Sequence, residues 1–179
     1  MKNFICLFAS LLIFCNSSEV SVQNESLSKA KPILKVAILI DGNDPAGVDL
    51  INERLYNSLL DFKTIQPIER AKLNVILKEK SLNLTGITTE QASEVSQIAG
   101  ADAVFVGNFS LYKTNHIHSE VWDGAISLRL VSVDNYKVLW HADHNTDGDF
   151  VLFSSMAGIG TVVDLCVKNM LKSIENKWN

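Results

Sequence analysis

The sequence predicts a single α/β domain in which a mixed β-sheet is flanked by helices. Two short, continuous apolar runs, at 36–40 and 103–107, have the length and composition of buried central strands. The segments between them repeat apolar residues at helical spacing, whereas the segments after them alternate apolar with polar residues. We therefore expect the order β-α-β-α-α-β-β-β-α, with neither internal repeats nor a second domain.

The first two strands are joined by a helix with a clear start signal. Strand 36–40 ends in turn-forming residues, among them Asp44, which can cap the next helix. Pro45 suits the first helical position, where no backbone N–H is needed. The helix should run to about residue 60. A short strand at 63–68 follows, and Pro67 either ends it or places it at a sheet edge.

Three further helices follow from apolar periodicity. The first spans about 70–80, and the second begins at Thr88 or Thr89 and stops at Gly100. Their inward faces should be formed by Leu73, Ile76, Leu77, Ala92, Val95, Ile98 and Ala99. The last helix spans about 153–178. Its core-facing stripe should contain Met156, Ile159, Val163, Val167, Met170, Ile174 and Trp178.

The second half of the sheet is predicted to be antiparallel. The strand that begins at 103 extends by alternation to about 111, and a polar bridge is expected over 114–123. Two strands, at 126–130 and 138–140, then pair across a turn at 134–137.

The N-terminus has the pattern of an export signal. Residues 1–15 carry one early basic residue and then an apolar run that is too short to span a bilayer. Leu12 lies three residues before Cys15, as in a bacterial lipobox, although Phe14 stands where such motifs usually have a small residue. We therefore expect lipidation at Cys15. The alternative is ordinary cleavage near Ser17, which would leave a soluble periplasmic protein.

A polar segment separates the expected anchor from the folded domain. Residues 16–34 are rich in Ser, Asn, Glu and Lys and lack apolar periodicity, which predicts a flexible tether before a domain at 35–179. At most roughly 3.5 Å per residue, this tether reaches about 65 Å. Asn16, directly after the cysteine, favours the periplasmic face of the outer membrane over the inner membrane.

Composition and motifs argue against several classes of function. The chain has a formal net charge of −4 and 47% hydrophobic residues, which suits a packed domain without attraction to nucleic acid. No dinucleotide-binding, P-loop, zinc-protease or nucleophile-elbow pattern occurs in the sequence. We therefore expect a protein without a cofactor or catalytic residues.

Two groups of residues are candidate sites. His116, His118, His141 and His144 are weak candidates for a metal site, because imidazoles in polar segments are more often simply solvated. The second group is Glu69, Arg70 and Asp102. Arg70 lies where a strand turns into a helix, and its guanidinium could bind backbone carbonyls or a carboxylate, with Asp102 as one partner. We interpret this group as a structural motif.

Several segments, taken in order, resemble the CsgG-like family of envelope lipoproteins. These are Val36 to Leu39, Thr64 to Arg70 with its Glu-Arg pair, Leu73 to Glu79, Thr89 to Gly107, and Ile126 to Asp134. The family includes the curli secretion channel and the penicillin-binding-protein activator LpoB. Its members of this type are not enzymes, so the resemblance implies a scaffold or partner-binding role.

The expected function is that of a non-enzymatic envelope lipoprotein that binds a partner, like the penicillin-binding-protein activator. The channel relative inserts long amphipathic hairpins into this fold, and the short, charged stretch from 111 to 125 leaves no room for two of them. The expected partner is an envelope protein such as a peptidoglycan synthase or an assembly component, with the membrane reached through the lipid anchor. The alternative is a periplasmic protein that binds a small ligand or a metal.

Overall fold

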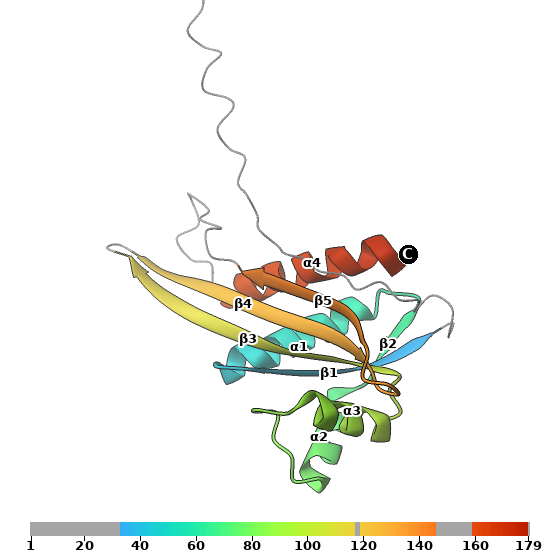
Figure 1. The fold of residues 1–179 in the computed structure, drawn as a ribbon. Helices are drawn as coiled ribbons and strands as arrows, with labels where there is room; N and C mark the ends of the chain where they lie inside the picture. The colour runs from blue at the N-terminus through green and yellow to red at the C-terminus, as the bar shows by residue number, and fades with distance from the viewer. Residues whose placement is uncertain (1–32, 117–118, 146–158, 179) are drawn as a thin grey trace, which may run out of the picture.

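The computed structural model describes residues 33–116, 119–145 and 159–178, which form a mixed α/β sandwich (Figure 1). In these residues the elements are β1 (Leu34–Gly42), α1 (Pro45–Leu59), β2 (Ile65–Pro67), α2 (Arg70–Glu79), α3 (Thr89–Ile98), β3 (Ala103–His116), β4 (Ser119–Ser132), β5 (Val138–Asn145) and α4 (Ile159–Trp178). This is the predicted order, so the predicted fold class is confirmed.

The described strands form one mixed sheet in the order β2-β1-β3-β4-β5. β1 lies parallel to both β2 and β3, whereas β3, β4 and β5 are antiparallel to one another. β2 is shorter than the predicted strand and forms one edge, where Pro67 needs no ladder donor on its outer side.

One face of the sheet is covered by α1 and α4. The packing there is apolar and includes an edge-to-face contact between Phe105 and Trp140, whose ring centroids are 5.9 Å apart at 89°. Val163, Val167, Met170 and Ile174 of α4 are buried in this cluster as predicted. Residues 153–158 of the predicted helix, including Met156, lie outside the described residues.

The opposite face is covered in part by α2 and α3. Their buried residues pack on alternate positions of β1, β3 and β4: Leu73, Ile76, Leu77, Ala92, Val95 and Ala99 against Ala37, Leu39, Val104, Val106 and Val131. One predicted inward residue is wrong, because Ile98 is 49% exposed. The buried residues Ala92, Val95, Ser96 and Ala99 recur every three or four positions, and Ile98 lies off the helix face that they form.

Local signals in the sequence set the helix ends. The Asp44 carboxylate accepts from the N–H of Gly47 at 2.6 Å and caps α1, with Pro45 at its start. Thr88, the cap of α3, forms a reciprocal capping box with Gln91. α3 stops at a left-handed residue, Gly100, whose φ is +79°.

The polar bridge expected over 114–123 is wrong. β3 continues to His116 and β4 starts at Ser119, so the two strands pair over fourteen positions as a long hairpin. β1 ends opposite Phe109, and the pairing with β5 reaches only Ala125, so the end of the hairpin projects beyond both neighbours (Figure 1). Alternation of apolar and polar residues reveals a strand only where one of its faces is buried. The projecting end of the hairpin has no such buried face, so its polar sequence did not reveal that the strands continue.

Candidate functional site

The helical layer formed by α2 and α3 ends partway along the sheet, and the face beyond it is polar. On β3, Val104 and Val106 lie under the helices, but Asn108 and Ser110, the next residues on the same face, are polar. The change occurs where the helices end, because the uncovered positions face water. We call this region the open sheet face. It comprises Asp41, Asn108, Ser110, Ser127, Arg129, His141, Asp143 and Asn145.

Strand register arranges these side chains in rows across the sheet. Asp41 of β1 is paired with Asn108 of β3, which is paired with Ser127 of β4, and Ser127 is in turn paired with Asp143 of β5. Four neighbouring strands at about 4.8 Å spacing give a row about 14 Å long. The next row toward α2 and α3 places Arg129 beside His141. The two rows form a hydrogen-bonding surface built on rigid strands.

The loop between α2 and α3 forms one border of this surface. The Asp41 carboxylate accepts from the N–H of Gly86 in that loop at 3.0 Å and from the N–H of Gly42 at 2.8 Å. The loop therefore lies beside a depression of about 480 Å³. It is lined by Asp41, Gly86, Ile87, Val106, Gly107, Asn108, Ser127, Arg129 and His141.

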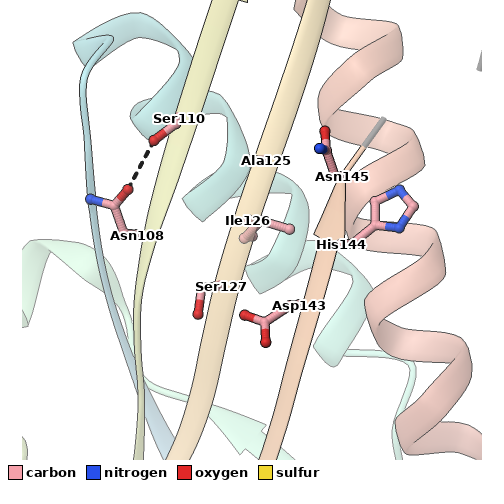
Figure 2. A pocket seen from close by; sticks show the side chains of 8 residues that line it. All are labelled: Asn108, Ser110, Ala125, Ile126, Ser127, Asp143, His144 and Asn145. Carbon is pink, nitrogen blue, oxygen red and sulfur yellow. Dashed lines mark hydrogen bonds between the residues drawn. The ribbon is translucent and has the colours of Figure 1, made fainter. Parts of the chain in front are cut away.

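A second depression of about 460 Å³ continues along β3, β4 and β5 (Figure 2). Figure 2 shows Asn108 bonded to Ser110, whose hydroxyl donates to the Asn108 amide oxygen at 3.1 Å. Two of its lining residues, Ile126 and His144, belong by register to the α4 side of the sheet. The surface as a whole is shallow and suits an extended partner more than an enclosed small ligand.

Charge on the open sheet face is mostly paired. His141 Nε2 lies 3.1 Å from an Asp143 carboxylate oxygen, and Asp41 is bound by two N–H groups. Among the carboxylates of the described residues, none forms an ion pair with Arg129.

Sequence reasoning missed the open sheet face. The available signal was the switch from apolar to polar residues at every second position of each strand.

The three histidines within the described residues do not gather at one place. His141 and His144 are three positions apart on β5, so they lie on opposite faces, and His144 is only 3% exposed. His116 is paired with Ser119, seven residues along β4 from the partner of His144, which is about 23 Å. His118 lies outside the described residues. Within the described part of the chain, no three metal-binding side chains gather.

Asp102 was one possible partner of Arg70, and the structure places another carboxylate beside the guanidinium. Arg70 donates instead to Asp49 of α1 at 2.7 Å, in an exposed ion pair. Asp102 accepts from the backbone N–H of Lys35 at 3.0 Å. Glu69 is the N-cap residue of α2 but makes no side-chain cap bond. α1 and α2 cover opposite faces of the sheet, so this ion pair links the two helical layers.

Among the helices of residues 33–116, 119–145 and 159–178, none contains an apolar stretch of membrane-spanning length. Cys15 and the predicted signal peptide lie outside the described residues, so their roles remain predictions from the sequence.

Comparison with known proteins agrees with the fold and with the resemblance. Residues 45–121 match the family model of the curli production assembly/transport component CsgG. No curated protein sequence matches the chain.

Several solved structures share the fold at low sequence identity. A PelC dodecamer from Paraburkholderia phytofirmans gives a TM-score of 0.54 at 13% identity, covering 87% of this chain and 94% of that one. The lipoprotein GNA1162 from Neisseria meningitidis gives 0.52 at 17% identity, covering 80% and 99%. The C-terminal domain of LpoB from Salmonella enterica gives 0.50 at 14% identity, covering 66% and 85%.

These identities establish a shared fold and nothing finer. The family match over residues 45–121 agrees with the resemblance seen in the sequence, and the fold is the one found in the LpoB C-terminal domain and in PelC.

Proposed function

We propose that this protein is a non-enzymatic, lipid-anchored module of the bacterial envelope that binds a protein partner, as an activator or scaffold and not as a channel. The observation that carries the proposal is the open sheet face. It offers amide, hydroxyl, carboxylate and guanidinium groups on rigid strands over two shallow, adjoining depressions. Such a surface can bind an extended segment of a partner without any chemical step.

The similarity to envelope proteins supports the setting of this function. The family model describes an assembly and transport component, and GNA1162 is described as a lipoprotein. A Cys15 anchor with a tether of about 65 Å would keep the domain near its own membrane. The partner therefore lies in the same membrane or extends a tall periplasmic domain toward it, as a peptidoglycan synthase could.

The anchor can be tested in cells with the full chain. We expect wild-type protein to incorporate labelled palmitate and to fractionate with the outer membrane, and Cys15→Ser to do neither. Incorporation by Cys15→Ser, or soluble wild-type protein, would contradict the anchor and leave the soluble periplasmic alternative.

Partner binding can be tested by placing a photo-cross-linking residue at Ser127 on the open sheet face. We expect a discrete cross-linked product containing one envelope protein. The matched control is Val75 on α2, which is 56% exposed but points away from the sheet face. A cross-linked product at Val75 and none at Ser127 would show that the partner binds the α2 surface instead of the open sheet face. The absence of a product at every exposed position would contradict partner binding itself.

A further inference from the structure

Arg129 differs from the other two arginines of the chain. Arg54 and Arg70 lie on helices and pair with Asp164 at 3.2 Å and with Asp49 at 2.7 Å. Arg129 lies on β4, is exposed, and makes no ion pair within the described residues. It is therefore the one arginine of the three whose guanidinium is left available in the described structure.

The position of Arg129 is also unusual within the sheet. On the same face of β4, the neighbour on one side is the exposed Ser127, and the neighbour on the other side is Val131, which is fully buried under the helices. Arg129 thus lies at the boundary between the apolar layer and the polar surface. Its depression contains the apolar side chain of Ile87 and two further hydrogen-bond donors, the Asn108 amide and the Ser127 hydroxyl.

One carboxylate, Asp41, lines the same depression, a second, Asp143, lines the adjoining one, and both already have partners. Asp41 is bound by the N–H groups of Gly42 and Gly86, and Asp143 by His141. Neither forms an ion pair with Arg129, but both keep the local potential from becoming strongly positive. The site should accept one negative charge and disfavour ligands with several.

We propose that Arg129 anchors a single carboxylate of the protein partner, with Ser127 and Asn108 as supporting donors and Ile87 in contact with the adjoining apolar part of the segment. This inference rests on the proposed function and names the chemistry that its partner must present. A planar guanidinium binds a carboxylate through two parallel N–H···O bonds, which gives orientation as well as attraction. The carboxylate belongs to a Glu or Asp side chain or to a chain terminus.

An isolated peptide should bind weakly, because the site is exposed and screened by water. We expect a dissociation constant on the order of 1 mM for a short probe, with the rest of the partner supplying further contacts. NMR suits this range. The chain has three arginines, so its spectrum contains three Nε–Hε signals, which Arg54→Gln, Arg70→Gln and Arg129→Gln assign.

The experiment uses the full chain in neutral detergent micelles and four probes. They are acetyl-AAEAA-amide, acetyl-AAQAA-amide, acetyl-AAAAA with a free C-terminus, and inorganic phosphate. We expect the Arg129 Nε–Hε signal to shift with the Glu peptide or with the free C-terminus, and the stronger of the two identifies the source of the carboxylate. No shift with either peptide, an equal shift with the Gln peptide, or a stronger shift with phosphate would overturn the proposal.

Substitutions of Arg129 separate the contribution of the planar, two-pronged guanidinium from the contribution of its positive charge. Arg129→Gln should weaken binding of the carboxylate peptide by about tenfold or more, whereas Arg129→Lys should give an intermediate loss because it keeps the charge without the planar fork. Arg54→Gln, which removes an arginine from the helical surface, is the matched control and should bind like wild type. Equal binding by Arg129→Gln would overturn the proposal.

The cross-linking assay distinguishes failure of this inference from failure of the proposed function. With the cross-linker at Ser127, Arg129→Gln should lose the product while Arg54→Gln retains it. If Arg129→Gln retains the full product, the partner exists but its carboxylate does not bind Arg129. If the wild-type chain yields no product from any surface, the proposed function itself fails.

Discussion

Asp41 shows how one side chain joins two parts of the fold. It ends the buried part of β1, and its carboxylate accepts hydrogen bonds from Gly42 beside it and from Gly86, which is 45 residues away. A sequence reading sees only a turn-forming residue after a strand. The bond to Gly86 positions the α2–α3 loop at the border of the open sheet face.

We predict that Asp41→Ala loosens this loop and lowers the free energy of unfolding by about 1 kcal/mol, the usual net contribution of such bonds at a partly exposed site. Urea unfolding should show the loss, and hydrogen exchange should accelerate at the Gly86 amide. Asp61→Ala, at an exposed carboxylate on the helical side, is the control. Unchanged exchange at Gly86 in Asp41→Ala would show that the bond does not hold the loop.

At the start of α3, the cap and a carboxylate act together. The N–H of Glu90 itself, and next the Thr88 hydroxyl, hold the pKa of the Glu90 carboxyl below its ordinary value. A lowered pKa in the folded state stabilises the fold at pH values above the unfolded pKa. This contribution is lost as the pH falls through the folded pKa.

Thr88→Ala should therefore raise the pKa of Glu90 toward its ordinary value and, through loss of the N-cap, cost about 1 kcal/mol of stability. An NMR titration of the Glu90 carboxyl carbon measures the first effect and urea unfolding the second. Part of the difference in unfolding free energy between Thr88→Ala and wild type comes from Glu90. That part should become smaller as the pH falls, because the Glu90 carboxyl is then protonated in both proteins. Thr88→Ser, which keeps the hydroxyl, should preserve both properties; a Glu90 pKa that is the same in Thr88→Ala would contradict this account.

At the scale of elements, α4 packs closely on β4 because one strand position lacks a side chain. A Cβ at Gly124 would overlap the Val162 side chain of α4 and would come within 3.3 Å of the Phe109 ring. Both neighbours are buried, so neither can move without disturbing the core.

We predict that Gly124→Ala costs about 1–3 kcal/mol of unfolding free energy, the usual range for overpacking, and shifts α4 relative to the sheet. Gly160→Ala on α4 is the matched control, since a Cβ there meets no atom within 4 Å. Thermal unfolding measures the cost, and chemical shifts of the Val162 methyl groups report the displacement. Equal melting temperatures for the two variants would contradict close packing at Gly124.

At the scale of the whole molecule, one sheet carries two unequal apolar layers. The layer under α1 and α4 contains the large side chains Phe105, Phe109 and Trp140, whereas the layer under the ten-residue helices α2 and α3 contains mainly Ala, Val and Leu. Because stabilisation follows the apolar area removed from water, the second layer contributes less.

We predict that α2 and α3 open before the sheet does. Native-state hydrogen exchange should give their amides a lower opening free energy than those of β1 and β3, and low concentrations of urea should lower it further. Leu73→Ala should accelerate exchange in α2 and α3 more than in α1. Uniform protection across all four helices would instead indicate one cooperative unit.

Much of this protein was determined by its sequence alone. Local signals were sufficient for element order, for the cap at Asp44, for the start of α3 at one of two adjacent threonines and for the described part of the α4 stripe, because each depends on a few neighbouring residues. The length of the β3–β4 hairpin, the pairing of Arg70 with Asp49 and the open sheet face were decided by tertiary structure. These features depend on strand register and on helix placement, which bring residues that are far apart in the chain close together in space. A local sequence pattern carries no information on which distant residues will become neighbours.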